Sequence, residues 1–207
     1  LYNQEDFSAG SQSQTSTSVS QQSLPMNGGA GHDKLIQLKN RYILTPVKSG
    51  LMMIDQRRAH ERILYEHHIR SFAMNYPVAQ RTLFPETVEM DPADYLMILE
   101  ILEDLHTIGF DIRDFGSNSV VISGYPADTY NDHPKELLES FLEVYKSTEG
   151  DIKSNVRERI ARSMAVAGSV KYGETLSGEL MQELVDSLFA CESPGYSPSG
   201  KPIVVIM

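Results

Sequence analysis

The sequence holds a single cysteine, Cys191, in 207 residues. One thiol cannot form a disulfide within the chain, and such low cysteine usage fits a reducing compartment. No apolar run approaches the roughly 20 residues that span a bilayer, and the N-terminal residues lack a basic region followed by an apolar core. We therefore expect a cytoplasmic protein without membrane association.

Positive charge is also scarce. Lys and Arg total 18 against 28 Asp and Glu, which gives a formal net charge of -10. An acidic chain gains little from displacing the counterions of nucleic acid, so we expect this segment to bind DNA only weakly or indirectly. The apolar fraction of 41% is ordinary for a globular protein, so a sizeable core can form.

Residues 1–33 are dominated by Ser, Gln, Thr and Gly. Such a composition cannot bury enough apolar surface to offset the entropy of ordering, so we predict a disordered interdomain linker. The first residue is Leu1 and not Met. Both features lead us to expect a piece of a longer protein.

Strand signals begin directly after that stretch. Three short apolar segments with β-branched residues and a turn signal predict strand, turn and strand over residues 35–38, 42–47 and 50–54. Asp55 then stands at the N-cap position of a helix that we expect to end before Pro77. The residues expected on one face of this helix are Ala59, Ile63, Glu66 and Arg70.

The rest of the chain alternates helix and strand signals. Residues 78–90, interrupted by Pro85, predict an extended edge segment, and residues 110–124 predict a β-hairpin. Further helices are expected over residues 91–108, 134–145, 155–170 and 177–189. The apolar residues 203–207 predict a buried strand that rejoins the first sheet.

Residues 55–66 read DQRRAHERILYE, directly after the third expected strand. This run and the strands before it resemble the C-terminal dimerisation domain of the DNA mismatch repair protein MutL, and the resemblance extends to about residue 207. It implies an α+β fold in which a mixed sheet with helices forms a dimerisation subdomain from residues 34–78 and 153–207. A smaller inserted α/β regulatory subdomain would cover residues 79–152.

The resemblance implies a homodimer that couples mismatch recognition to downstream repair factors. Helices cover one face of a small sheet, and a symmetric partner can cover the other. The residues expected on such a face are Ile36, Ile43, Leu51, Met53, Val204 and Ile206. The other implied partners are the sliding clamp and, through the full-length protein, a MutS-like mismatch recognition protein. The family's ATPase domain is absent from this chain, so we expect no cofactor in this domain, and a cytoplasmic, nucleoid-associated location in a bacterial cell.

Nuclease-active members of this family carry Asp-Gln-His-Ala followed by two glutamates. Four residues match that motif: Asp55, Gln56, Glu61 and Glu66. Arg57 and Arg58 stand in place of the His and the Ala. The resemblance therefore points to an endonuclease motif that is degenerate in this chain.

Two further segments of the family's metal site also differ. Arg162 stands at a cysteine position, and Ser197 and Ser199 stand at a cysteine and a histidine position. Hydroxyl oxygens are poor zinc ligands, and like charges about 4 Å apart repel by about 4 kcal/mol at an effective dielectric near 20. We predict no metal and no catalytic residue, with the arginines paired to the acidic groups. The alternative is a divergent metal-dependent DNA-nicking endonuclease that uses Asp55, Glu61 and Glu66.

Gln80, Leu83, Phe84 and Pro85 have the spacing that the family uses to dock on the sliding clamp. A Gln side chain can fill a polar notch while the two apolar side chains enter a pocket, and Pro lowers the entropy lost on binding. The alternative is that Leu83 and Phe84 pack on the next helix.

His67 and His68 are adjacent on the first expected helix. They could bind a metal together with Glu61 or Glu66, but two neighbouring polar residues are also typical of a solvated helix face. We favour the solvated face.

Overall fold

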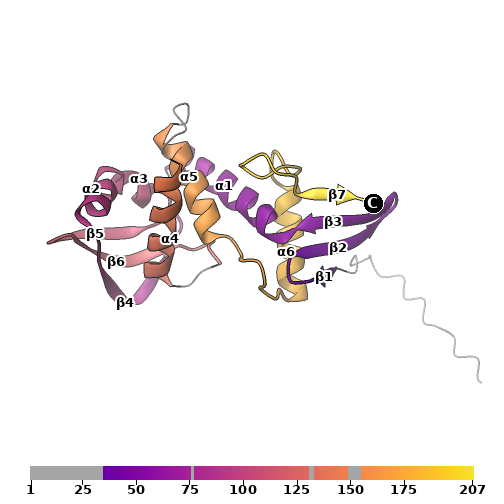
Figure 1. The fold of residues 1–207 in the computed structure, drawn as a ribbon, viewed down its shortest axis with the longest axis horizontal. Coiled ribbons are helices and arrows are strands. Elements are labelled where there is room, and N and C mark those ends of the chain that lie inside the picture. The colour runs from indigo at the N-terminus through magenta and orange to yellow at the C-terminus, as the bar shows by residue number, and fades with distance from the viewer. Residues whose placement is uncertain (1–34, 76, 131–132, 149–154) are drawn as a thin grey trace, which may run out of the picture. The chain divides into compact units, whose positions relative to one another are not determined.

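A computed structural model describes residues 35–75, 77–130, 133–148 and 155–207. The predicted linker, residues 1–33, lies outside the described residues. Within them, helices and two antiparallel sheets make an α+β fold, as predicted from the sequence (Figure 1). No helix in this part of the chain is both long and apolar enough to cross a bilayer.

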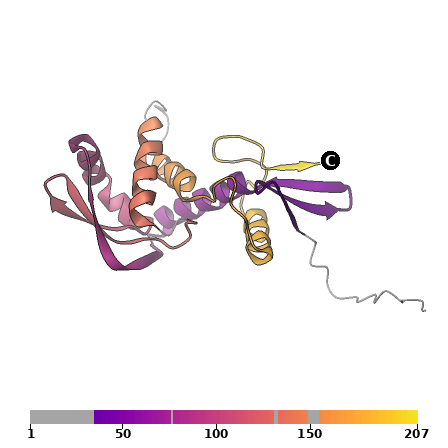
Figure 2. The same ribbon diagram turned by 60° about the horizontal axis from the view of Figure 1, so that its bottom comes forward.

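The first sheet has four antiparallel strands in the order β1-β2-β3-β7. They are β1 (Ile36–Leu38), β2 (Tyr42–Val47), β3 (Gly50–Asp55) and β7 (Val204–Ile206). The strand, turn, strand prediction is confirmed, and β7 rejoins this sheet beside β3 (Figure 2). The predicted burial of β7 is wrong, because β7 is an edge strand in which Val205 and Ile206 are 43% and 57% exposed.

One face of this sheet packs on helix α6 (Gly178–Phe189). Ile43 and Ile54 pair across β2 and β3 and are fully buried. The α6 residues in the same core are Met181, Leu184, Val185 and Leu188. Side chains alternate along a strand, so Ile43, Val204 and Ile206 lie on the side of this core and not with Ile36 and Met53. The single apolar face predicted from the sequence is therefore corrected to two.

The opposite face carries an apolar row across all four strands. Ile36, Leu44, Met53 and Val205 are successive cross-strand partners. Ile36 is 51% exposed and Val205 43% exposed. We call these four residues the open row, because no helix or loop among the described residues buries them.

Helix α1 (Gln56–Met74) begins at the predicted N-cap, where the Asp55 side chain accepts a hydrogen bond from the Arg58 N–H. It ends at Asn75, which adopts the left-handed conformation with φ 51°. The four residues expected at helical spacing all lie on α1, and Ala59 is buried. The buried residues of α1 are Gln56, Ala59, Leu64, His68 and Ser71.

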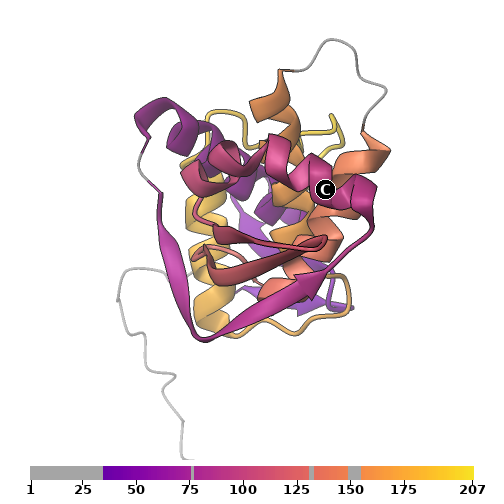
Figure 3. The same cartoon turned by 90° about the vertical axis from the view of Figure 1, so that its left-hand side faces the viewer.

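The second sheet has three antiparallel strands in the order β4-β6-β5. They are β4 (Ala79–Glu89), β5 (Asp111–Gly116) and β6 (Ser119–Pro126). Ser117 and Asn118 both have positive φ, as a tight hairpin turn requires, so the hairpin is confirmed. β4 is an edge strand, as predicted, and it bends along its length (Figure 3).

Four helices accompany this sheet: α2 (Pro92–Glu100), α3 (Leu102–Thr107), α4 (Pro134–Ser147) and α5 (Val156–Gly168). The single helix predicted over residues 91–108 is divided at Ile101, where φ is −104° and ψ is 12°. Ile98, Ile101 and Leu105 are nevertheless buried in one core, so the predicted apolar stripe continues across the division.

Helix α5 joins the core of the second sheet. Its Ile160, Met164 and Ala167 pack with residues such as Leu137 and Phe141 of α4. α1 contacts both α5 and α6, so it is shared between the parts of the chain that carry the two sheets. The boundaries predicted for the dimerisation and inserted subdomains stay predictions.

Candidate functional site

Asp55, the first residue of the motif, is almost fully buried, with 3% exposure. Its carboxylate accepts hydrogen bonds from the Arg58 N–H at 3.1 Å and from the Tyr172 hydroxyl at 3.1 and 3.0 Å to its two oxygens. The Nε atoms of Arg58 and Arg41 lie 3.6 and 4.0 Å from Oδ2. Both oxygens of Asp55 are therefore engaged by groups of the chain itself.

Glu61 lies about one and a half turns further along α1 and pairs with Arg57. The Arg57 Nε atom is 3.1 Å from Glu61 Oε1. Burial raises the pKa of Glu61, while the adjacent Arg57 guanidinium, and more weakly Lys201, lower it. The pairing predicted between these two residues is confirmed.

Glu66 lies beyond Glu61 on the same helix and is held by two kinds of donor. The nearest guanidinium nitrogen of Arg62 is 3.5 Å from Glu66 Oε1. The backbone N–H groups of Glu192 and Ser193 donate to its two oxygens at 2.8 and 3.2 Å. Glu66 thus fastens the segment after α6 to α1, which is a structural use of the carboxylate.

Gln56 is fully buried and forms a polar joint between α1 and the first sheet. It accepts a hydrogen bond from the Gln37 side chain at 2.7 Å and donates to the Asn40 carbonyl at 3.0 Å. Gln37 in turn accepts the Leu176 N–H at 3.2 Å. The side chain of Gln56 therefore has a structural role in holding α1 against the first sheet.

The segment at the two serines lies next to the motif. Arg58 donates to the Pro202 carbonyl at 2.9 Å, and Arg62 donates to the Tyr196 carbonyl at 2.7 Å. The structure therefore brings residues 55–66 together with residues 196–202, as the resemblance implied.

Ser197 and Ser199 bond to each other within that segment. Ser197 is buried, with 1% exposure, and its Oγ lies 3.0 Å from Ser199 Oγ. Ser197 Oγ also accepts the Lys201 N–H at 3.1 Å. The hydroxyl groups close a turn here.

Arg162 lies on α5 and pairs with Glu158 one turn earlier, at 3.1 Å. Burial and then Glu158 raise the pKa of Tyr65 on α1, while the Arg162 and Arg62 guanidinium groups lower it. The predicted pairings of Arg57 and Arg58 are confirmed. Arg162 pairs with Glu158 on its own helix, and its predicted pairing with the acids of the motif stays a prediction.

Three partners of the motif were missed by sequence reasoning. Arg62 could have been found, because it precedes Glu66 by four residues on a helix. Tyr172 and Arg41 had no such signal, since they reach Asp55 only after the chain has folded. In the described part of the chain, each motif carboxylate has a guanidinium nitrogen within 4.0 Å, so a divalent cation would have to compete with fixed positive charge.

The four residues with the clamp-docking spacing lie in β4. The β4–β6 pairing shifts between Arg81 and Glu86, so residues 82–85 bulge out of the ladder. Leu83 and Phe84 are 93% and 82% exposed. They do not pack on the next helix, so that alternative is wrong.

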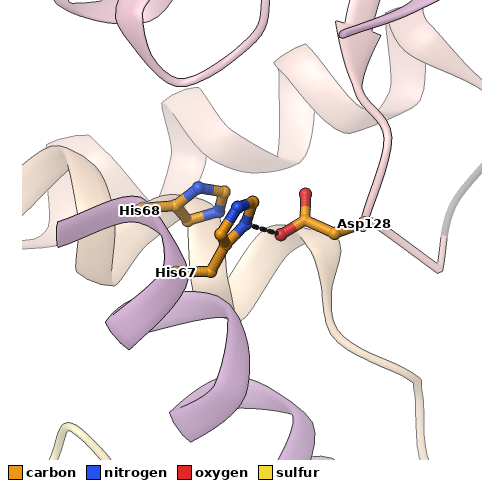
Figure 4. A group of neighbouring side chains, drawn as sticks. All are labelled: His67, His68 and Asp128. Atoms are coloured by element: carbon orange, nitrogen blue, oxygen red, sulfur yellow. Dashed lines mark hydrogen bonds and ion pairs between the residues drawn. The ribbon is translucent and has the colours of Figure 1, made fainter. Parts of the chain in front are cut away.

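His67 and His68 differ sharply in environment. His68 is fully buried, so the solvated helix face predicted for the pair is wrong at this residue. His67 forms an ion pair with Asp128, which lies in the connection after β6 (Figure 4). Neither glutamate of the motif is its partner.

Residues 35–176 match the family model described as the MutL C terminal dimerisation domain. This chain belongs to that family. The DNA mismatch repair protein MutL of Chlorobium limicola is 37% identical over 178 residues, which is 86% of this chain and 28% of that protein. The MutL of Bacteroides fragilis is 38% identical over 169 residues, or 82% of this chain and 27% of that protein. The chain thus spans less than a third of the length of these relatives, and it is a MutL C-terminal dimerisation domain of the DNA mismatch repair proteins.

Proposed function

We propose that this MutL domain forms a homodimer through the open row and docks partners, coupling mismatch recognition to downstream repair factors. The single observation that carries the proposal is the apolar row Ile36–Leu44–Met53–Val205 on the sheet face away from α6. A sheet buried on one side only normally has polar residues on its other face. Four apolar neighbours in one row therefore indicate that another molecule buries this face.

A second copy of the chain fits this face best. Leu38 and Leu51 extend the apolar face beside the row and are 43% and 36% exposed. A two-fold axis through such a face pairs the same residues of both copies, which is the commonest arrangement in soluble oligomers. The family's description as a dimerisation domain supports this assignment.

The mass in solution tests it. We expect Met53→Glu to give a monomer, because the charge would stand at the centre of the buried interface. Leu96→Glu is the matched control: Leu96 is 65% exposed on α2, away from the open row, and this variant should stay dimeric. A monomeric parent, or a dimer that survives Met53→Glu, would refute the proposed interface.

The dimer would hold together the further parts of two longer proteins. Linking two arms to one dimer raises their effective concentration for each other, so they could close around DNA without this acidic domain binding DNA tightly. In this account the protein acts in the cytoplasm, near the nucleoid, and meets a MutS-like mismatch recognition protein through its other parts.

The bulge of β4 is the proposed docking site for the sliding clamp. Gln80 precedes it in the ladder opposite Tyr125, and the bulge carries Leu83, Phe84 and Pro85. Two large apolar side chains that are more than four-fifths exposed have no role in the core of this chain. A protruding apolar pair beside a Pro suits insertion into a pocket on a partner.

Clamp binding by wild type and Leu83→Ala/Phe84→Ala is the corresponding measurement. We expect the double variant to lose at least tenfold in affinity, and the fold to be unaffected because both side chains face solvent. Phe115→Ala is the matched control, since Phe115 is 69% exposed on β5. Equal affinity of all three proteins would rule out this docking site.

We also propose that the domain itself does not cut DNA. The support is the pairing of Asp55, Glu61 and Glu66 with guanidinium groups and backbone donors. A plasmid-nicking assay with manganese tests this. Nicking that Asp55→Asn abolishes would establish the endonuclease alternative, whereas an intact dimer that leaves plasmid unnicked supports the module.

A further inference from the structure

Three side chains with metal-binding atoms meet away from the degenerate motif. His67 and His68 come from α1, and Asp128 comes from the connection between β6 and α4 (Figure 4). One ligand atom from each lies within 4.8 Å of the others. Residues 60 positions apart in sequence are therefore brought together at one point of the fold.

Several buried polar atoms of these three residues have no hydrogen-bond partner among the described residues. His68 is fully buried, and neither of its ring nitrogens has a hydrogen-bond partner among the described residues. The second carboxylate oxygen of Asp128, Oδ1, is also buried without a partner there. Buried polar atoms of native proteins are nearly always paired, so two such residues side by side indicate a missing binding partner.

We propose that His67, His68 and Asp128 bind a first-row transition-metal ion, with zinc favoured. Two imidazoles and one carboxylate are the ligand types that zinc accepts. Tetrahedral zinc with ligands at about 2.0–2.1 Å needs ligand atoms about 3.3 Å apart, which small rotations of the three side chains can achieve. Such an ion would replace the direct His67–Asp128 ion pair and give the ring of His68 its partner.

The neighbouring histidine and glutamate are not part of this group. His60 lies two turns earlier on α1, where its Nδ1 accepts the Val170 N–H at 3.0 Å. Glu66 accepts the backbone N–H groups of Glu192 and Ser193. The proposed metal site therefore differs from the endonuclease motif in every ligand.

Three protein ligands leave a fourth position. His67 and Asp128 both border a cavity of about 590 Å³, whose other walls include Ala127, Tyr130, Leu184 and Ser187. An ion between His67 and Asp128 would lie in the wall of this cavity, where water or an exogenous ligand could complete its coordination. The ion would also fasten α1 to the segment after β6.

One cationic side chain opposes the ion. Arg70 borders the same cavity, and its charge disfavours positive charge on His67. Its Nε donates to the Glu66 carbonyl at 3.1 Å, so the guanidinium is held nearby. Arg70→Gln should therefore bind zinc more tightly than the parent. This variant raises the zinc affinity, whereas the ligand variants below should lower it.

The test is zinc titration of the 207-residue chain by calorimetry, with cobalt absorption spectra to report the coordination. We expect one ion per chain and visible bands typical of tetrahedral cobalt. His67→Gln and Asp128→Asn should each weaken binding more than about 100-fold, because even an outer partner of a ligand is worth 10- to 100-fold. His68→Asn is a further ligand variant. The side chains of His67 and Asp128 are partly exposed, at 35% and 27%, so their variants keep the test valid if His68→Asn does not fold.

Glu61→Gln at the degenerate motif is the matched control and should bind zinc as the parent does. A parent that binds no zinc would overturn the proposed site. So would binding that survives His67→Gln and Asp128→Asn but is lost in Glu61→Gln, and that result would also overturn the inactive-motif proposal. Dimer formation does not depend on this ion, so the mass measurement above stands independently.

Discussion

The Tyr172 hydroxyl donates to both carboxylate oxygens of Asp55, at 3.1 and 3.0 Å, across 117 residues of sequence. The ring of Tyr172 also lies under the Arg41 guanidinium, 4.4 Å from its centroid. Asp55 is the N-cap of α1, so this contact ties the first helix to the segment between α5 and α6. The residue that would start a metal site is here a structural joint.

Removing the hydroxyl should weaken this joint. Tyr172→Phe keeps the ring under Arg41 and loses only the two hydrogen bonds to Asp55. We expect the free energy of unfolding to fall by about 1–2 kcal/mol, because a hydrogen bond to a charged group contributes about that much and Tyr172 is partly exposed. Urea unfolding measures it. Tyr196→Phe, at a ring that is 61% exposed, should change the free energy by less than about 0.5 kcal/mol.

Restoring the family's residues at four of the five differing positions, with Arg162 left in place, should restore metal binding at Asp55. The variant carries Arg57→His, Arg58→Ala, Ser197→Cys and Ser199→His, in a background with His67→Gln and Asp128→Asn. Thiolate and imidazole replace guanidinium and hydroxyl, so we expect zinc to bind at least about tenfold more tightly than in that background.

The matched control replaces the same four residues with Ala. It removes the same positive charge without adding ligands, so it should gain little zinc affinity. If both variants bind zinc alike, charge removal alone governs the site, and the argument from missing ligands fails.

Local signals in the sequence predicted local structure correctly. The N-cap at Asp55 was predicted correctly because it depends on a few adjacent residues, and so was the turn at Ser117 and Asn118. β7 was predicted to be buried because its residues are apolar. Apolar composition does not show whether the same chain or another molecule buries a segment. Among the described residues Val205 is 43% exposed, which is consistent with the interface proposed above.

In the candidate sites too, contacts between residues close in sequence were predictable and contacts between distant residues were not. The pairing of Arg57 with Glu61 is a four-residue helical spacing and was predictable. The approach of Asp128 to His67 spans 61 residues and depends on how the connection after β6 lies against α1. His68 was misplaced because the apolar residues of α1 do not mark one face clearly, so the phase of its buried face could not be predicted.

Gly50 is a position where only glycine fits. Its φ is +144°, and a Cβ atom there would lie 2.1 Å from the Met207 carbonyl oxygen. Leu51 and Met207 exchange backbone hydrogen bonds of 2.9 Å at this point. Gly50→Ala must therefore push the end of the chain away from β3, and we expect a loss of about 2 kcal/mol with faster amide exchange at Leu51.

Gly178→Ala is the matched control for that substitution. Gly178 is the first residue of α6 and has nothing within 4 Å of its Cβ position. Ala there should leave the stability unchanged or raise it by up to about 1 kcal/mol. Equal losses at the two positions would show that the contact with Met207 does not matter.

His60 makes stability depend on pH. Burial lowers the pKa of His60 from 6.5 to about 4, and its Nδ1 must stay unprotonated to accept the Val170 N–H. The unfolded chain binds a proton below pH 6.5 that the folded chain does not take up until about pH 4. The free energy of unfolding should therefore fall across that interval as the pH is lowered, by about 2–3 kcal/mol from this residue, with the full contribution present above pH 6.5.

Unfolding in urea at several pH values, with a chelator present, measures this effect. His60→Gln can still accept the Val170 N–H through its side-chain oxygen and does not titrate, so its stability should fall less steeply with acid. The stability of His67→Gln should instead fall more steeply with acid than that of the parent. The hydrogen bond to Asp128 raises the pKa of His67, so His67 stabilises the fold below pH 6.5 and loses that contribution as the pH rises. A His60→Gln protein that loses stability as steeply as the parent would show that the imidazole of His60 is not the group responsible.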